Sequence, residues 1–193
     1  MSLFSLKNKS ILITGSSKGI GKSIAHQSAL MGANVIISSR KIDACEDTAK
    51  EINDDVGKEV AFPIACNIAD DDQLKNLVDK TIQTLGGIDS LICNAATNTF
   101  MGSMLDMDIE QFDKVMHNNI RSNQLLCNLC LPHMIEKKDG TIIIISSIAA
   151  IKGSAFLGAY NISKAADVMI VKNIAAEFGH KNIRANSIAP GLI

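Results

Sequence analysis

Short runs of apolar residues alternate along this chain with longer segments in which apolar positions recur every three or four residues. The short runs are rich in Ile and Val and predict buried strands, whereas the longer segments predict amphipathic helices. Strands are expected at residues 10–14, 34–38, 60–64, 90–93, 141–146 and 184–188. Helices are expected at residues 19–31, 42–55, 71–85, about 109–136 and 159–178.

The order of these elements predicts the fold. Six strands alternate with helices, and the consecutive isoleucines at 142–145 are typical of a parallel strand that is covered on both faces. We therefore expect an α/β fold with a doubly wound parallel sheet, Rossmann-like, in a single domain over residues 1–193. In such sheets ligands bind where the carboxyl ends of the strands meet, so the residues that follow each strand are the first candidates for a site.

Composition and charge narrow the possible partners. The 19 Lys and Arg residues against 20 Asp and Glu leave a net charge of -1, so no nucleic-acid partner is expected. No apolar run approaches the roughly 20 residues of a membrane helix, and no leader-like segment opens the chain, so we expect no membrane association. Five cysteines without a compact framework of spacings favour free thiols in an intracellular compartment, with the cytoplasm preferred.

The chain ends at Ile193, directly after the sixth predicted strand and the segment Ala189-Pro190-Gly191-Leu192. A doubly wound sheet would normally continue with a helix that covers this edge. We expect that C-terminal elements are missing and that the domain is truncated here. Two questions stay open: whether the chain is a fragment or a natural short form, and whether a targeting signal follows.

The first strand leads into a glycine-rich turn, Thr14-Gly15-Ser16-Ser17-Lys18-Gly19-Ile20-Gly21. Gly15 permits a tight turn, and Gly19 and Gly21 allow the backbone and the next helix to approach a pyrophosphate. The start of that helix supplies N–H groups and the positive end of its dipole. An ordinary loop is the alternative, but the position between a strand and a helix favours a phosphate cradle.

The second strand ends in Ser38-Ser39-Arg40-Lys41, where a domain that selects NAD would carry an acidic residue for the ribose hydroxyls. Arg40, together with Lys18 from the glycine turn, is instead suited to pair with a 2′-phosphate. This pattern favours NADP(H). The alternative is that Arg40 and Lys41 are solvated charges at the start of a helix.

Tyr160, the single tyrosine of the chain, and Lys164 stand four positions apart at the predicted start of a helix. Positions i and i+4 share one face, so an ammonium group there favours the ionised form of a phenol. Tyr160 is therefore a candidate general acid. The alternative is a core tyrosine beside a lysine whose charged end reaches solvent.

In combination, these motifs resemble the short-chain dehydrogenase/reductase family. The resemblance runs from the first strand to the last residue and rests on Thr14-Gly15-x-x-x-Gly19-Ile20-Gly21, Asn94-Ala95-Ala96, Ser147, Tyr160-x-x-x-Lys164 and Pro190-Gly191. It implies a nicotinamide cofactor and hydride transfer between that cofactor and a small-molecule carbonyl or alcohol. The residues that it implies for cofactor binding are Gly15, Ser17, Lys18, Gly19, Ile20, Gly21, Ser39, Arg40, Asn67, Ile68, Asn94, Ala95, Tyr160, Lys164, Pro190, Gly191 and Ile193.

The same resemblance implies the catalytic roles. Tyr160 would donate the proton during reduction, and Ser147 would bind the substrate oxygen. Lys164 would bind the ribose of the nicotinamide and favour the ionised phenol. Asn119 falls where the family has an asparagine that holds a water behind the lysine, with Asn118 beside it.

Two residues depart from the family's common pattern, Asn67 in place of Asp and Ala96 in place of Gly. Ala96 and its neighbours are similar to the branch of NADPH-dependent reductases that act on ketones and retinal, and resemblance to 3-oxoacyl-carrier-protein reductases is almost as good. The leading prediction is reduction of a ketone or aldehyde carbonyl. The alternatives are a 3-oxoacyl-thioester reductase and a non-catalytic dinucleotide-binding or oligomerisation module. The family also pairs the helices near 112–134 and 160 between subunits, which implies a homo-oligomer, a tetramer.

Other residues are given no role. Cys127 and Cys130 have the spacing of metal ligands but lie in a predicted helix without a second pair, so we expect buried thiols and no metal. The four histidines form no ligand pattern. The segment 100–104 either lines a substrate pocket or packs beneath a loop.

Overall fold

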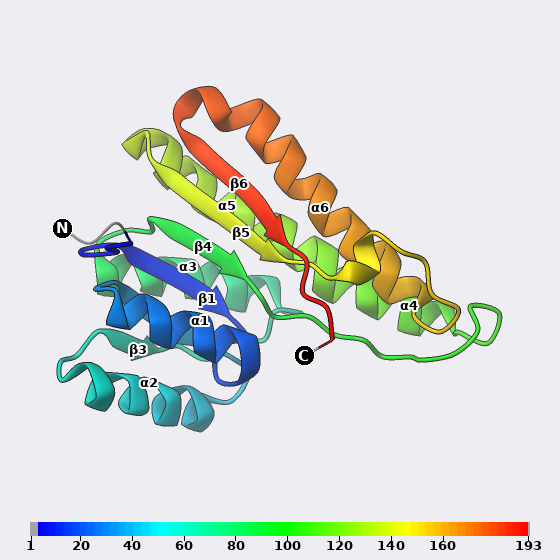
Figure 1. The fold of residues 1–193 in the computed structure, drawn as a ribbon, viewed down its shortest axis with the longest axis horizontal. Helices are drawn as coiled ribbons and strands as arrows, with labels where there is room; N and C mark the ends of the chain where they lie inside the picture. Colours follow the sequence, from blue (N-terminus) through cyan, green and yellow to red (C-terminus); the bar gives the residue numbers. More distant parts are fainter. Residues whose placement is uncertain (1–3, 193) are drawn as a thin grey trace.

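The computed structural model describes residues 4–192, which form a parallel six-stranded sheet between two layers of helices (Figure 1). The strands are β1 (Ser10–Thr14), β2 (Asn34–Ser38), β3 (Ala61–Pro63), β4 (Ser90–Cys93), β5 (Gly140–Ile145) and β6 (Ile183–Ile188). The helices are α1 (Gly19–Leu30), α2 (Ile42–Val56), α3 (Asp71–Leu85), α4 (Ile109–Met116), α5 (Ser122–Lys137) and α6 (Gly158–Phe178). Short helical turns are η1 (His117–Arg121), η2 (Ile148–Ala150) and η3 (Gly179–Lys181). The strand order β3-β2-β1-β4-β5-β6 confirms the doubly wound fold.

The observed boundaries lie within one residue of the expected ones, and two elements show features with clear physical reasons. The third strand is limited to Ala61–Pro63 at the edge of the sheet, where the missing N–H of Pro63 is tolerated. The helix expected at about 109–136 is continuous through α4 and α5, but it passes through the π-helical turn His117–Arg121. Sequence periodicity does not distinguish such a turn from α-helix.

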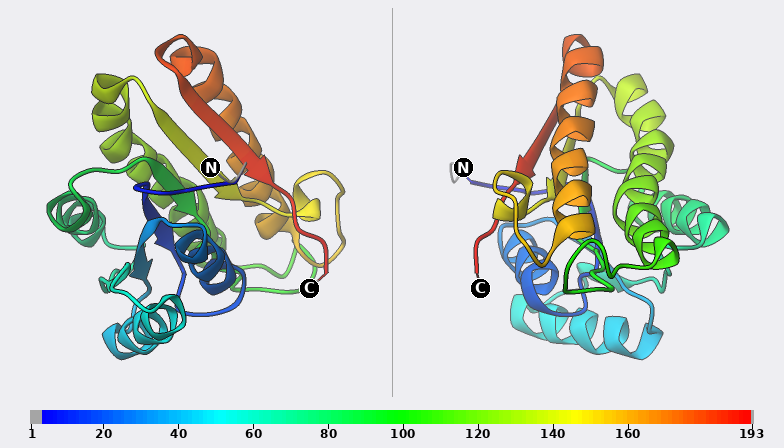
Figure 2. Two further views of the ribbon diagram at one scale, coloured as in Figure 1. Left: turned by 60° about the vertical axis from the view of Figure 1, so that its left-hand side comes forward. Right: turned by 90° about the vertical axis from the view of Figure 1, so that its right-hand side faces the viewer.

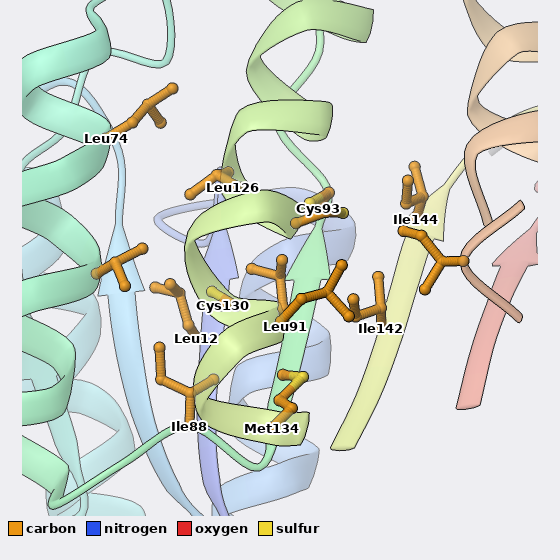
Figure 3. Close-up of a cluster of buried hydrophobic side chains, with 14 of the residues drawn as sticks. Leu12, Leu74, Ile88, Leu91, Cys93, Leu126, Cys130, Met134, Ile142 and Ile144 are labelled. Atoms are coloured by element: carbon orange, nitrogen blue, oxygen red, sulfur yellow. The ribbon is translucent and has the colours of Figure 1, made fainter. Parts of the chain in front are cut away.

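Two apolar cores hold the helices against the sheet. The core beneath α1 and α2 includes Ile13, Ala25, Ile37 and Ile52. The larger core lies beneath α3, α5 and α6, and in Figure 3 its labelled members are Leu12, Leu74, Ile88, Leu91, Cys93, Leu126, Cys130, Met134, Ile142 and Ile144. Figure 2 shows α5 and α6 side by side in this second layer. Because each buried side chain of this size contributes about 1.5–3 kcal/mol, the sheet is a firm platform for the loops at its edge.

The carboxyl ends of the strands meet at one edge, where the chain also ends (Figure 1). β1 and β4 are parallel neighbours in the sheet, with Ile13 opposite Ile92. After β1 the chain continues to β2 on one side of this pair, and after β4 it continues to β5 on the other side. This is the point at which a doubly wound sheet binds its ligands. Within residues 4–192, none of the helices combines the length and the apolar character needed to cross a bilayer.

Asp89 stabilises the end of the sheet where β1 and β4 begin, opposite to the edge at which the carboxyl ends of the strands meet. Its buried carboxylate accepts a hydrogen bond of 2.7 Å from the Ser10 amide and pairs with Lys137 and Lys9. Burial acts to raise the pKa of the Asp89 carboxyl, but Lys137, the Ser10 amide and Lys9 outweigh it and hold this pKa below its ordinary value. Asp89 therefore stabilises the junction of β1 and β4 as a carboxylate.

We expect Asp89→Asn to lower the free energy of unfolding at neutral pH by about 2 kcal/mol, because two lysines lose their buried partner. A depressed pKa stabilises the folded protein above the ordinary value of about 3.9, and this contribution is lost as the pH falls below it. The difference in the free energy of unfolding between the variant and the original protein should therefore shrink towards pH 3. Urea unfolding at several pH values measures this difference. If it were independent of pH, Asp89 would not stabilise the fold as a carboxylate.

Candidate active site

The glycine turn after β1 has the backbone of a phosphate cradle. Gly15 and Gly19 adopt the left-handed conformation, with φ of 65° and 57°. A Cβ at Gly21 would lie 2.4 Å from the Gly15 oxygen, so α1 approaches the turn as only glycine allows. Lys18, at the N-cap of α1, makes no side-chain capping bond, and no acidic residue occupies the first turn. The residues present therefore fit the pyrophosphate of a dinucleotide.

Asn94, at the end of β4, holds this turn in place. Its side-chain amide donates hydrogen bonds of 3.0 Å to the carbonyl oxygens of Thr14 and Gly15. The Thr14 hydroxyl in turn accepts bonds from the backbone amides of Asn94 and Ala95, each of 3.1 Å. Asn94 therefore supports the turn from the neighbouring strand.

The groups expected near the adenosine half of a cofactor lie around the end of β2. Arg40 and Lys18 are exposed, and neither forms an ion pair within residues 4–192. The Ser39 hydroxyl lies 3.2 Å from the Cys45 sulfur. Asn67 is exposed, and its side-chain oxygen accepts a bond from the Ala69 amide. Both cations are thus available to an anionic group.

Ser147, Tyr160 and Lys164 lie around one cavity of about 330 Å³ at the carboxyl edge of the sheet. The complete lining is Ile20, Asn94, Ala96, Ile145, Ser146, Ser147, Tyr160, Lys164, Pro190, Gly191 and Leu192. The Ser147 hydroxyl oxygen accepts a bond of 3.1 Å from the Ala149 amide, which leaves its proton available to a ligand. The cavity therefore joins the start of α1 to the three side chains suited to carbonyl chemistry.

Lys164 does not extend to solvent as a lysine beside a core tyrosine would. Its ammonium group is buried and lies 5.7 Å from the centre of the Tyr160 ring. Nζ donates to the Ile145 carbonyl oxygen at 2.8 Å and to the Asp167 carboxylate at 2.9 Å. Sequence reasoning missed Asp167, although an acidic residue three positions after Lys164 on an apolar helix was a signal that could have found it.

Asn119 lies in the π-helical turn and is fully buried. Its amide group donates to the Thr97 carbonyl at 2.8 Å and to the Ser163 hydroxyl at 3.0 Å, and its oxygen accepts from the Thr97 amide. The side chain thereby ties the loop after β4 to α6 and does not line the cavity. Its role in a proton relay stays a prediction.

Two sequence comparisons identify the family. The profile described as short chain dehydrogenase matches residues 9–193. Dehydrogenase/reductase SDR family member 4 of Sus scrofa is 37% identical over 188 residues, which make up 97% of this chain and 67% of the pig protein. The chain belongs to the short-chain dehydrogenase/reductase family. Members of this family are oxidoreductases that use nicotinamide dinucleotides and act on small molecules.

Solved structures of short-chain dehydrogenases have the same fold. A short-chain type dehydrogenase/reductase from Mycobacterium marinum is 37% identical, with a TM-score of 0.91 over 99% of this chain and 78% of that one. A 7α-hydroxysteroid dehydrogenase in complex with NADH and a 7-oxo bile acid is 36% identical, with a TM-score of 0.92 over 97% of this chain and 72% of that one. The chain therefore shares its fold with solved members of the family.

The C-terminal segment and the loops after β4 and before α6 hold the other predicted positions. Pro190 accepts a bond of 3.0 Å from the Ile148 amide, which brings the C-terminal segment beside Ser147. Ile193 lies outside the described residues. The Gly102 amide bonds to the Phe156 carbonyl at 3.0 Å, so the loop after β4 packs on the loop before α6. Met101 and Phe156 nevertheless remain exposed, and their place in a substrate pocket stays a prediction.

The five cysteines, namely Cys45, Cys66, Cys93, Cys127 and Cys130, are buried free thiols. Burial raises the pKa of the Cys66 thiol to about 11. His26 lies 3.0 Å from Asp55, and the His117 ring contacts the Ala69 carbonyl. Within residues 4–192, no cluster of three or more His, Cys, Asp or Glu side chains could hold a metal ion.

Proposed function

We propose that the protein is an NADPH-dependent oxidoreductase that reduces the carbonyl group of a ketone or aldehyde, with Tyr160 as the general acid. The observation that carries this proposal is the single cavity shared by Ser147, Tyr160 and Lys164 beside the glycine turn. Membership of a family of oxidoreductases supports the type of reaction. In this proposal the bound cofactor supplies a hydride to the carbonyl carbon.

The chain's own residues handle the charge and the proton. As hydride reaches the carbon, negative charge develops on the carbonyl oxygen, and the Ser147 hydroxyl donates a hydrogen bond to it. The Tyr160 phenol transfers its proton to that oxygen, which completes the alcohol. Lys164 lies on the same face of α6 and stabilises the phenolate that remains. Solvent then returns a proton to Tyr160.

The preference for NADPH is assigned to Arg40 and Lys18. In this assignment their unpaired, exposed cations bind the 2′-phosphate of the cofactor at the end of β2. The glycine turn holds the pyrophosphate, and Lys164 binds the ribose next to the nicotinamide. The 7α-hydroxysteroid dehydrogenase named above is in complex with NADH, so the cofactor preference of this chain requires its own test.

We expect Arg40→Ala to raise the KM for NADPH by about 10-fold to 100-fold, because a charge-assisted pair with phosphate is lost. The KM for NADH should change little, since NADH carries no 2′-phosphate. Steady-state kinetics with both cofactors measures the effect, and Lys41→Ala, also an exposed cation, is the matched control. An equal loss with NADH and NADPH would show that Arg40 does not select the phosphate.

A panel of ketones, aldehydes and 3-oxoacyl thioesters, each assayed for oxidation of NADPH, tests which class of substrate the protein prefers. Preference for the thioesters would favour the reductase of fatty-acid synthesis. Binding of NADPH without turnover would favour the non-catalytic module. The cytoplasmic location is likewise part of the proposal and rests on the free thiols.

A homotetramer is the proposed assembly. A groove of about 420 Å³ runs between α5 and α6 and is lined in part by Leu131, Pro132, Ile135 and Phe178. Apolar side chains on two neighbouring helices support pairing with a second copy of the chain. Light scattering after size-exclusion chromatography tests this assembly, and a monomer at all concentrations would contradict it.

A further inference from the structure

A buried polar cluster lies between α5, α6 and the sheet. It consists of Lys164 and Asp167 on α6 and Asn123 on α5, whose exposed fractions are 2%, 0% and 2%. Asp167 Oδ2 accepts a bond of 2.9 Å from Lys164 Nζ, and Asp167 Oδ1 accepts a bond of 2.9 Å from Asn123 Nδ2. Each oxygen of the buried carboxylate thus has its own donor.

Such a cluster is costly and therefore calls for a physical explanation. Removing a carboxylate and an ammonium group from water is costly, and their mutual attraction offsets this cost only when the two groups lie close together and are fully hydrogen-bonded. The cost is visible in Asp167, because burial raises the pKa of its carboxyl even though Lys164 and Asn123 act to lower it. An apolar pair of similar volume would often stabilise the fold as well or better.

The geometry of Lys164 Nζ indicates what the cluster achieves. An ammonium group has three N–H donors in a tetrahedral arrangement. One is bonded to the Ile145 carbonyl and one to Asp167, so the third is directed away from both. Lys164 also lines the cavity, which makes that donor the one available to a ligand there.

We propose that Asp167, oriented by Asn123, is a positioning residue that anchors the Lys164 ammonium group beneath the cavity and aims its remaining N–H at the cofactor. This inference rests on the proposed function, in which Lys164 binds the ribose. Asp167 itself contacts neither substrate nor cofactor. It acts through Lys164 as a fixed counter-ion.

Among the described residues, the other titratable groups near the cluster are Tyr160, beside Lys164, and Cys93, which interacts with Asp167 and adjoins Cys127 and Cys130. Cys93 and Cys130 are labelled in Figure 3, where they lie between α5 and the sheet. A hydrogen bond to Cys127 and burial raise the pKa of Cys93, and burial raises that of Cys130, so both stay neutral near pH 7. Within residues 4–192, Asp167 is the one acidic side chain paired with Lys164.

Nuclear magnetic resonance of the Lys164 side chain, in the protein without cofactor, tests the anchor directly. In Asp167→Asn the protons of the ammonium group should exchange with solvent at least about 10-fold faster, because Nζ loses the bond of 2.9 Å that holds it against the carboxylate. Asn123→Ala should accelerate the exchange less, since the ion pair remains. Asn123→Ala also serves if Asp167→Asn does not fold, as judged by circular dichroism.

Asp89→Asn is the matched control, because Asp89 is another buried carboxylate with a lysine partner, at the opposite edge of the sheet. It should leave the exchange of the Lys164 protons unchanged. An unchanged exchange rate in both Asp167→Asn and Asn123→Ala would overturn the anchor. An equal acceleration in Asp89→Asn would overturn it too, because a general loss of stability would then explain the effect.

Binding of NADPH, followed by its fluorescence, tests the aim of the free N–H. Asp167→Asn should weaken binding by about 10-fold, because the third N–H is no longer held in one direction, whereas Asp89→Asn should leave the affinity unchanged. An unchanged affinity in Asp167→Asn, or an equal loss in Asp89→Asn, would overturn the positioning role. If the unaltered protein binds neither NADPH nor NADH, the proposed function fails, and the cofactor half of this inference fails with it; the Lys164 signal still decides the anchor separately.

Discussion

Replacing Tyr160 with phenylalanine is expected to lower kcat for carbonyl reduction by about 10²-fold to 10⁴-fold, the usual contribution of a positioned general acid. The variant removes a single oxygen and keeps the ring, which lies 5.7 Å from Lys164 Nζ and packs at the start of α6. The chain contains one tyrosine, so no other phenol can substitute. Oxidation of NADPH by the best substrate of the panel measures the effect.

The control for this variant is the affinity for NADPH, measured by fluorescence titration. It should remain within a few-fold of the original value, because the phenol oxygen is the group assigned to the substrate. A parallel loss of turnover and binding would show that Tyr160 supports the cavity and does not transfer the proton. If Tyr160→Phe retained full turnover, the proposed mechanism would be wrong.

Replacing Gly21 with alanine is expected to have the second large effect. Alanine in a helix interior is ordinarily favoured over glycine by about 1 kcal/mol. Here the added Cβ would lie 2.4 Å from the Gly15 oxygen and 2.5 Å from Asn94 Nδ2, so the turn or the helix must move. We expect the free energy of unfolding to fall by about 1–3 kcal/mol and the affinity for NADPH to fall by about 10-fold or more.

Gly57→Ala is the matched control for Gly21→Ala. Gly57 ends α2 with φ of 73°, and an added Cβ there meets no atom within 4 Å. Gly57→Ala should lower the free energy of unfolding by about 1–2 kcal/mol, because alanine disfavours the left-handed backbone conformation, and should leave NADPH binding unchanged. If Gly21→Ala bound NADPH as well as Gly57→Ala does, the turn after β1 would not be the pyrophosphate cradle.

Most of the fold could be predicted from the sequence, because helices and strands depend on apolar periodicity over a few neighbouring positions. The order of the elements then restricts the topology, since crossovers between parallel strands are right-handed and gather the strand ends at one edge. The glycine turn was identifiable for the same reason, as its conformation depends on which residues lack a Cβ. Tyr160 and Lys164 stand one helical turn apart, so their common face also followed from local geometry.

Contacts between distant segments could not be predicted in this way. Asn123 and Asp167 are separated by 44 positions, and Asn94 holds a turn 79 positions away. The side chain of Asn119, in the π-helical turn, bonds to Thr97 and Ser163, which lie 22 and 44 positions away, and periodicity reveals neither contact.

The sequence by itself thus determined the doubly wound sheet, the glycine turn and the pairing of Tyr160 with Lys164 on one helix. Only the tertiary structure decided that Lys164 is buried against Asp167, that Asn94 supports the turn, and that Ser147 shares a cavity with the C-terminal segment. The physical reason is the range of the interactions. Backbone conformation is set mainly by neighbours in the chain, whereas a buried hydrogen bond or ion pair exists only once packing has brought its two partners together and excluded water.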